Sequence, residues 1–189
     1  EKEVTLRDCR ALILRSPGEG DAEGMLAYLR QTAGETHFLL RTPEEVTMTL
    51  EEEKAFLKSC AEDSRRMMMA AFADGKPVGS ISFAPAGPRK KVCHRAEMGV
   101  AVLREYWGQG LGTLLMREAL DRARAMGYEQ MELAVYEDNS RAIRLYERFG
   151  FKHWGRVRRA FRLEDGSYRD DLLVGMFLKE AEDAEGSRP

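Results

Sequence analysis

The chain has 189 residues, a net charge of −2, and 43% hydrophobic and 33% charged residues, a composition typical of one globular domain. No block of basic residues supports binding to nucleic acid, and no apolar run reaches the ~20 residues that a membrane helix needs. The cysteines, Cys9, Cys60 and Cys93, are scattered and odd in number, which favours the reducing cytoplasm over a disulfide framework. The three histidines are equally dispersed, so no metal site is expected.

The N-terminal part of the chain predicts one strand and two helices. In chain order we expect a loose polar lead-in at 1–10, a strand at 11–15, a helix that ends near Gly34 and a helix at 50–61. Asp21 is a candidate cap for the first helix, and Thr49 with Glu52 forms a capping-box pattern before the second. The glutamates crowded around the second helix, among them Glu53, are interpreted as a solvated face.

The rest of the chain predicts a mixed sheet. In chain order we expect strands at 66–72, 78–83 and 92–103, a helix at 111–126, a strand at 130–136, a helix at 140–149, strands at 151–163 and 168–179, and a disordered tail at 180–189. The first two of these strands flank Asp74-Gly75-Lys76-Pro77, a turn typical of a β-hairpin. This order predicts an α/β (α+β) fold, with a mixed, mostly antiparallel sheet and helices on both faces. No repeat or linker divides it, so 11–179 is expected to be one domain.

Residues 98–116 carry the clearest chemical pattern. An apolar run predicts a buried strand at its start, and apolar residues along one face predict an amphipathic helix from Leu111 onward. Gly108, Gly110 and Gly112 occupy the junction. Without side chains there, the helix N-terminus exposes its free N–H groups and the positive end of its dipole, which suits a phosphate. Glycines also make plain turns, so the loop alone leaves both interpretations open.

Together with its surroundings, this segment resembles the GNAT superfamily of acyl-CoA-dependent N-acetyltransferases. The family pattern, a strand followed by [Q/R]-x-x-G-x-[G/A] at the start of a helix, is matched by 107–112 after 100–102, and a second family segment is matched by 139–151. Trp107 departs from the Gln or Arg that the family most often has at that position. The resemblance implies a GNAT-like domain over 11–179, acetyl-CoA as co-substrate and, as a family habit, a homodimer.

The resemblance also implies which residues bind the donor: Val100, Ala101, Val102, Trp107, Gly108, Gln109, Gly110, Leu111, Gly112, Thr113 and Asn139. The backbone edges of Val100 and Val102 would hydrogen-bond the pantetheine arm like an added strand and polarise the thioester carbonyl. Their side chains can pack in an ordinary buried strand at the same time. Asn139 would contact the cofactor arm, and it is also suited to cap the helix that follows.

Tyr146 and Glu97 are the candidate catalytic residues. Tyr146 matches the family tyrosine near the thioester sulfur, where a phenol can protonate the leaving thiolate; packing in the core is the alternative. Glu97 faces away from its apolar neighbours on the strand, and it is either a general base or an exposed or ion-paired carboxylate. Ala134 stands where members that acetylate ribosomal-protein N-termini often have a base glutamate, which leaves Glu137 as a further candidate.

The predicted function is a cytoplasmic N-acetyltransferase that moves an acetyl group from acetyl-CoA to a primary amine by direct attack in a ternary complex. No cysteine or serine stands at a motif position for a nucleophile, so no acyl-enzyme is expected. The acceptor is a small-molecule or peptide amine. The alternatives are a non-catalytic acyl-CoA-binding or regulatory module on the same fold, and a dinucleotide-binding oxidoreductase. The spacing G-x-G-x-G, and the position of Glu132 inside a strand, argue against the oxidoreductase.

Overall fold

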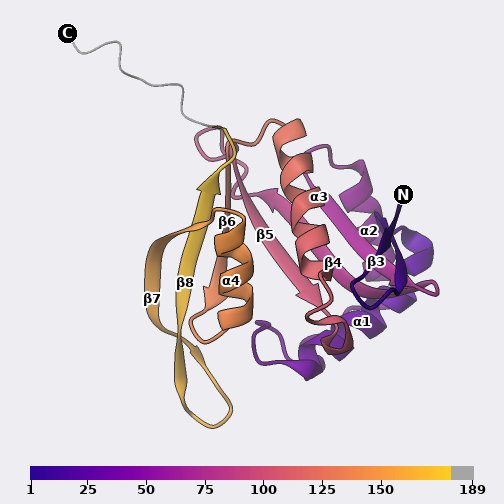
Figure 1. The fold of residues 1–189 in the computed structure, drawn as a ribbon, viewed down its shortest axis with the longest axis horizontal. Coiled ribbons are helices and arrows are strands. Elements are labelled where there is room, and N and C mark those ends of the chain that lie inside the picture. The colour runs from indigo at the N-terminus through magenta and orange to yellow at the C-terminus, as the bar shows by residue number, and fades with distance from the viewer. Residues whose placement is uncertain (180–189) are drawn as a thin grey trace.

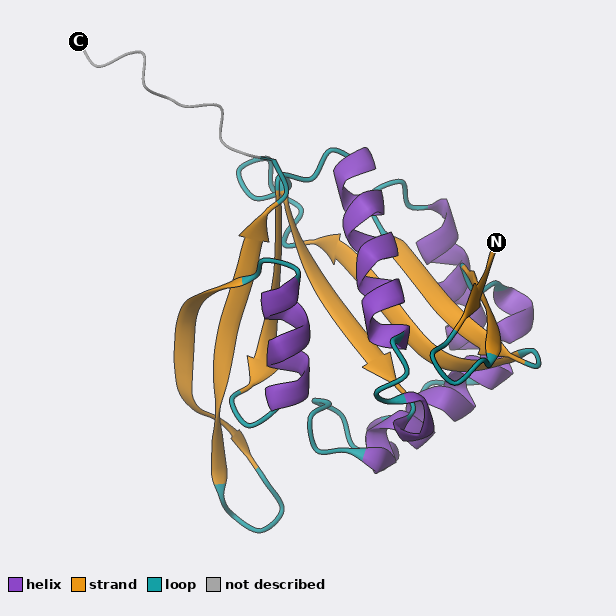
Figure 2. Cartoon of the chain, in the orientation of Figure 1, coloured by secondary structure: helices purple, strands orange, loops and turns teal. Residues whose placement is uncertain are grey.

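The computed structural model describes residues 1–179, which form one eight-stranded sheet and its helices (Figures 1 and 2). The strands are β1 (Lys2–Thr5), β2 (Ala11–Arg15), β3 (Met67–Ala73), β4 (Lys76–Pro85), β5 (Arg95–Val102), β6 (Gln130–Tyr136), β7 (Lys152–Arg162) and β8 (Tyr168–Phe177). The α-helices are α1 (Ala22–Glu35), α2 (Leu50–Glu62), α3 (Leu111–Ala125) and α4 (Ser140–Arg148). The strand order across the sheet is β1-β2-β3-β4-β5-β6-β8-β7. Only β5 and β6 pair in parallel, which confirms the predicted mixed, mostly antiparallel sheet.

Helices cover both faces of the sheet, as predicted. Figure 2 shows α3 and α4 in front of it. A Cβ added to Gly79 of β4 would lie 3.0 Å from Leu111 and 3.4 Å from Leu115, both on α3, so this face of β4 packs directly against that helix. On the other face, the Tyr28 hydroxyl of α1 donates to the carbonyl of Ala101 in β5 at 2.8 Å. The central strands therefore lie between α1 and α3.

The two parallel strands separate after a short contact. β5 and β6 are paired only where 95–97 lie beside 130–132. Beyond that point Figure 1 shows them diverging, with β5 running toward the start of α3 and β6 toward α4. A strand edge without a partner keeps free N–H and C=O groups, so the wedge between β5 and β6 has two open backbone edges.

Residues 1–10 are not a loose lead-in, contrary to the expectation, because they supply an edge strand. β1 pairs antiparallel with β2 from Lys2↔Leu14 to Thr5↔Ala11, and Leu6 beyond it is 4% exposed. Three of the four β1 side chains are exposed, so the strand has no apolar pattern to predict it. The domain boundary at residue 11 stays a prediction, and the expected tail at 180–189 lies outside the described residues.

Two further details differ from the expectation, namely how α1 is capped and where β5 begins, although Asp21 does stand at the N-cap position of α1. Asp21 does not cap α1 through its side chain, because its carboxylate accepts hydrogen bonds from Arg15 at 2.7 and 2.8 Å and from the Gly18 N–H at 2.7 Å. β5 begins at Arg95 rather than at 92, because the Arg95 N–H closes a turn onto the Val92 carbonyl at 3.1 Å. Neither hydrogen bond is part of the sequence pattern from which the expectation was made.

The second helix starts as predicted but buries one of its glutamates. Thr49 Oγ1 accepts from the Glu52 N–H at 3.2 Å, and Glu52 Oε2 accepts from the Thr49 N–H at 2.8 Å, which confirms the capping box. Glu53, interpreted as solvated, is 1% exposed and shares the buried face of α2 with Leu57. Within the described residues neither of its carboxylate oxygens has a hydrogen-bond partner. The prediction of a fully solvated acidic face was therefore wrong for Glu53.

Candidate active site

The loop between β5 and α3 presents a row of free N–H groups. In the described part of the chain, the N–H groups of 108–112 donate to no protein acceptor. Gly108 and Gly110 have φ angles of 78° and 92°, a conformation that L side chains rarely adopt. The row lies at the N-terminus of α3, where the helix dipole is positive. This arrangement is suited to phosphate oxygens.

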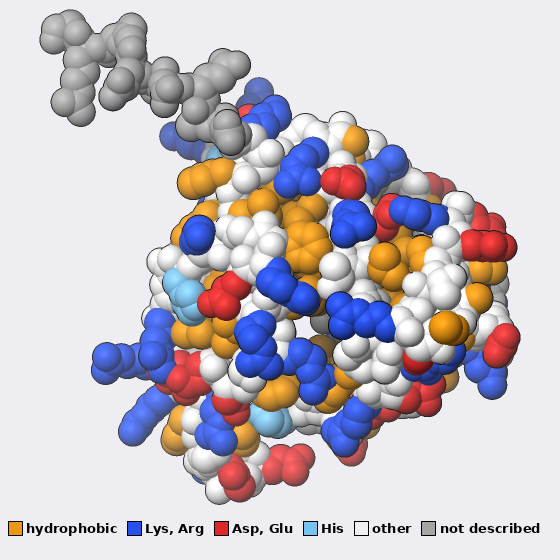
Figure 3. Space-filling model, in the orientation of Figure 1, with side chains coloured by type: hydrophobic (Ala, Val, Ile, Leu, Met, Phe, Trp, Pro, Cys, Tyr) orange, Lys and Arg blue, Asp and Glu red, His pale blue; other side chains and the backbone are white. Residues whose placement is uncertain are grey.

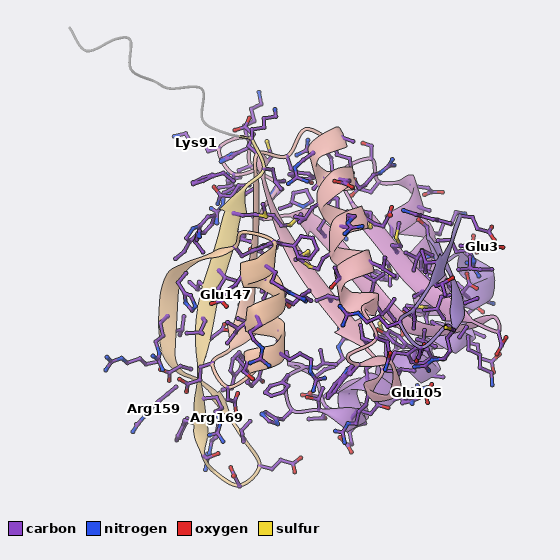
Figure 4. All side chains as sticks on the ribbon, in the orientation of Figure 1. Glu3, Lys91, Glu105, Glu147, Arg159 and Arg169 are labelled. Carbon is purple, nitrogen blue, oxygen red and sulfur yellow. The ribbon has the colours of Figure 1, made fainter. Side chains whose placement is uncertain are left out.

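Arginines of α4 add positive charge beside this loop. Arg141, Arg144 and Arg148, together with Glu147, line a hollow on this face. Figure 3 shows Lys and Arg side chains gathered over α4, and Figure 4 labels Glu147 on this helix. The Arg148 guanidinium also donates to the Thr113 hydroxyl at 3.5 Å. Sequence reasoning missed these arginines, although their spacing of three and four residues places them on one helical face.

Trp107, the departure from the family pattern, connects the loop to β5 and to α4. Its indole N–H donates to the Val102 carbonyl at 2.7 Å, and the Arg141 guanidinium lies 3.8 Å from its ring centre. A cation over an indole face is attracted by the ring quadrupole. Trp107 therefore fixes the end of β5 relative to the start of α4.

The two family segments meet where α3 and α4 approach closely. A Cβ on Gly112 would lie 3.1 Å from Leu145 Cδ2, so a side chain there would force the helices apart. Leu111 is 1% exposed, and its side chain packs against Gly79 of β4. Only its backbone N–H is therefore available to a ligand of the loop. Gln109 accepts a hydrogen bond from the Arg7 N–H at 3.2 Å through its carbonyl, which ties the loop to the N-terminal segment.

The free edge of β5 presents the backbone donors predicted for Val100 and Val102. The Leu103 N–H donates to the Val78 carbonyl at 3.0 Å, on the β4 side. Because N–H groups alternate between the two edges of a strand, those of Val100 and Val102 point into the wedge toward β6. Ala101 has the opposite orientation, so of the three predicted residues it offers no donor to the wedge.

Asn139 is the N-cap of α4, as predicted. Its side-chain oxygen accepts from the Ala142 N–H at 3.2 Å. Capping fixes the direction of α4, and with it the position of Tyr146. Contact between Asn139 and the cofactor arm stays a prediction.

Tyr146 lies in a dry environment that keeps its hydroxyl protonated. The residue is 7% exposed, and its ring centre lies 5.8 Å from that of Phe151. Burial raises the pKa of Tyr146 to about 12. A phenol that is neutral at physiological pH can donate a proton to a leaving thiolate, and the same burial also makes it part of the core. Both predicted interpretations therefore fit its place in the fold.

Glu97 faces the side of the sheet opposite to Tyr146. Val102 is the cross-strand partner of Gly79, which faces α3, so Glu97, five residues before Val102, points away from α3 and α4. It is exposed, and it forms no ion pair within residues 1–179. Its neighbour Glu132 is instead paired with Arg95. The predicted alternation is confirmed, and Glu97 keeps a free carboxylate.

The two other positions considered for a base are less suited. Ala134 lies exposed on the same face as Glu97 but has no titratable group. Glu137 uses both oxygens, one with the Arg156 guanidinium and one with the Asp170 N–H at 3.1 Å. Its carboxylate is therefore held by β7 and β8.

Two searches of the described residues bear on metals and membranes. Within 1–179 no group of three or more His, Cys, Asp or Glu side chains is placed to hold a metal ion. No described helix combines the length and the apolar character needed to cross a membrane.

Comparison with known proteins decides the family. The Acetyltransferase (GNAT) family profile matches residues 27–151. The chain belongs to this family. It is 28% identical over 144 residues to the L-methionine sulfoximine/L-methionine sulfone acetyltransferase of Pseudomonas aeruginosa, a match that covers 76% of this chain and 82% of that protein. A GNAT-family acetyltransferase from Streptococcus pneumoniae has a similar structure, with 30% identity, a TM-score of 0.84, and coverage of 88% of this chain and 99% of that one.

Acetyl-CoA is the acetyl donor of this GNAT enzyme. A Salmonella typhimurium protein solved with its cofactor acetyl-CoA shares the fold, with 18% identity, a TM-score of 0.78, and coverage of 93% and 99% of the two chains. The free N–H groups of 108–112 fit a diphosphate, the α4 arginines fit further phosphate oxygens, and the open β5 edge fits an extended amide arm. Membership of an acetyltransferase family contradicts the dinucleotide-binding oxidoreductase, and it favours an enzyme over the non-catalytic acyl-CoA-binding module.

Proposed function

We propose that this enzyme transfers the acetyl group directly to a primary amine of a small, amino-acid-like acceptor. The observation that carries the proposal is the wedge, with Tyr146 on one face of the sheet, Glu97 on the other, and the donors of Val100 and Val102 between them. The acceptor class is supported by the relatives, whose names specify L-methionine sulfoximine, L-amino acids and phosphinothricin. A peptide amine is the alternative acceptor.

Each residue has one task in this mechanism. Glu97 takes a proton from the acceptor ammonium, directly or through water, so that the nitrogen lone pair can attack the thioester carbonyl carbon. One of the two free N–H groups, that of Val100 or that of Val102, holds the carbonyl oxygen as it gains negative charge, and the other holds an amide carbonyl of the extended arm. Tyr146 donates its hydroxyl proton to the sulfur as the carbon–sulfur bond breaks. The acetylated nitrogen still carries one extra proton, and it passes this proton through water to the Tyr146 phenolate, which restores the hydroxyl. The products are the N-acetylated amine and free CoA.

Direct attack needs no protein nucleophile. Cys9, Cys60 and Cys93 are all free thiols, and none of them belongs to the segments 98–113 or 139–151. Alignment of the two substrates in the wedge can then supply much of the rate enhancement. The free thiols also support the proposal that the enzyme works in the reducing cytoplasm.

A homodimer is part of the proposal. It is supported by exposed apolar side chains on β7 and β8, where Trp154 is 40%, Val157 47% and Phe177 70% exposed. The rings of Trp154 and Phe177 lie 5.7 Å apart, and exposed apolar side chains that adjoin one another are typical of association surfaces. Light scattering on the purified protein would return twice the chain mass.

The test of the function is thiol release from acetyl-CoA with a panel of amino acids and amines. We expect Tyr146→Phe and Glu97→Gln to lower kcat by about 100-fold or more while acetyl-CoA still binds, because each substitution removes only a proton-transfer group. Tyr168→Phe, at an exposed tyrosine on β8, is the matched control and should leave kcat unchanged. Unchanged kcat in Tyr146→Phe and Glu97→Gln would contradict the assigned roles.

A further inference from the structure

A carboxylate that the mechanism does not use lies on the same side of the sheet as Glu97. Asp171 of β8 is the cross-strand partner of Tyr136 in β6, and Tyr136 is four residues along β6 from Glu132, the neighbour of Glu97. Residues an even number apart on a strand, and residues directly opposite each other, share one face. Glu97, Tyr136 and Asp171 therefore face the side that α3 and α4 do not cover.

Aromatic rings gather around Tyr136, the cross-strand partner of Asp171. Tyr136 stacks on Phe161 of β7, with ring centres 3.8 Å apart and planes 10° from parallel. Phe38, from the segment after α1, lies edge-on to Tyr136 at 6.0 Å, and His37 is tilted against Phe38 at 4.2 Å. Segments far apart in the sequence thus converge on the end of β6. The faces of aromatic rings carry negative charge and attract cations.

The neighbouring carboxylates already have cationic partners. Arg169, labelled at the lower end of β8 in Figure 4, donates to Asp138 at 2.9 Å, and His37 lies 3.4 Å from the same carboxylate. Glu137 is paired with Arg156. Asp171 is different, because its Oδ1 is buried and has no hydrogen-bond partner among residues 1–179. Burial also raises its pKa. Asp171 as a whole is half-buried, and a carboxylate oxygen that is buried without a partner favours the binding of a cation or a donor.

We propose that Asp171, with the rings of Phe38, Tyr136 and Phe161, forms a subsite for a second protonated nitrogen of the acceptor. The inference rests on the proposed function and narrows its substrate class to diamines and diamino acids. Glu97 and Asp171 lie four residues apart in register along β6, roughly 13 Å, and on the two strands that flank β6, roughly 10 Å apart across the sheet, so about 16 Å separates their Cα atoms. With about 3 Å of contact at each end, up to about 10 Å is left between the two nitrogens. A chain of about five to seven methylene groups fits this space.

The test compares acceptors that differ only in the second nitrogen. Cadaverine is paired with pentylamine, and L-lysine with L-norleucine, each in the thiol-release assay with acetyl-CoA. For the wild type we expect kcat/KM to be at least about tenfold higher for the member with two nitrogens, since a charge-assisted contact in a sheltered site has about that effect. Asp171→Asn should remove the preference through KM, with the value for pentylamine unchanged.

Matched variants separate the subsite from general effects. Asp121→Asn makes the same change on the exposed side of α3 and should keep the full preference. Asp171→Asn is expected to fold, because it replaces a desolvated charge by a neutral side chain of the same shape. If circular dichroism shows otherwise, Phe161→Leu, which removes one of the stacked rings, must lower the preference in its place.

Calorimetry of cadaverine binding to the CoA-bound enzyme separates the two proposals. Acetyl transfer without a preference for the second nitrogen would overturn the subsite and leave the function standing. Binding that Asp171→Asn abolishes, without any acetyl transfer, would support the subsite and overturn the function. Absence of both binding and transfer would overturn both.

Discussion

Tyr146 is packed in the core, and the proposed mechanism also makes it the general acid. Because burial raises its pKa to about 12, the hydroxyl keeps its proton well above neutral pH. We therefore expect kcat to show no loss from pH 7 to pH 10 that depends on this residue. The pH profiles of kcat for the wild type and for Tyr146→Phe provide the measurement. An alkaline limb near pH 10 that Tyr146→Phe removes would contradict the buried, protonated state.

Glu53 makes stability depend on pH in a defined direction. Burial raises its pKa in the folded state, so the folded protein holds the proton more tightly than the unfolded chain. The free energy of unfolding should therefore fall as the pH rises from the pKa of this carboxyl in the unfolded chain, about 4.3, through its pKa in the folded protein. Glu53→Gln removes this charge, and we expect it to raise the free energy of unfolding at pH 7 by about 1–3 kcal/mol.

Urea denaturation of Glu53→Gln and the wild type at pH 3.5 and pH 7 checks this expectation. The two proteins should differ at pH 7 and converge at the lower pH, where both carry a neutral side chain. Glu51→Gln, in the same helical turn and with a side chain that is 80% exposed, is the control and should change little. Equal stability of Glu53→Gln and the wild type at pH 7 would show that the carboxylate has a partner in solution.

At the scale of the elements, the contact between α3 and α4 brings together the glycine loop at 108–112 and Tyr146, the proposed general acid. Gly112→Val would place a methyl group against Leu145, where an added Cβ already lies 3.1 Å from Cδ2. We expect α4 to move outward, with a loss of about 1–3 kcal/mol in stability and weaker acetyl-CoA binding. Thermal unfolding and calorimetry measure both. Gly20→Val, where nothing lies within 4 Å, should affect neither, and a Gly112→Val variant with normal binding would disprove the coupling.

Local patterns in the sequence predicted the elements that have strong local signals. The strands at 11–15 and 130–136 have the expected bounds, and the capping box of α2 forms as expected. β1 was missed because an exposed edge strand has no apolar alternation. Asp21 was misassigned because Arg15, six residues earlier, takes its carboxylate. Local propensity cannot report contacts of this kind.

The candidate site was predicted in part for the same reason. Family resemblance pointed to Tyr146 and the glycine loop, strand alternation pointed to Glu97, and their joint action at the wedge stays a proposal. The alternation of the strand also placed Glu97 on the correct face. The wedge itself depends on how far β5 and β6 pair, which is a tertiary property. Asp171 gave no local signal either, because its aromatic surroundings come from three separate segments.

At the scale of the whole molecule, the sheet opens between β5 and β6, and α3 and α4 lie on one of its faces (Figure 1). In the proposed mechanism the donor binds on this face and the acceptor approaches from the other. A ligand that binds only the folded state stabilises it by mass action. Acetyl-CoA at about 100 times its dissociation constant should therefore add about 2.7 kcal/mol to the free energy of unfolding. Thermal melts with and without acetyl-CoA measure this, and an unchanged midpoint would contradict binding to the folded enzyme.

The most direct test of the account is calorimetric titration of acetyl-CoA into the wild type, Gly110→Asp and Gly127→Asp. Both glycines border α3 and have positive φ angles, 92° and 80°, so the two variants carry the same substitution under similar backbone strain at opposite ends of one helix. A carboxylate at Gly110 should repel the diphosphate. We predict that the wild type and Gly127→Asp bind acetyl-CoA and that Gly110→Asp does not. Equal binding by all three would contradict the placement of acetyl-CoA on this loop.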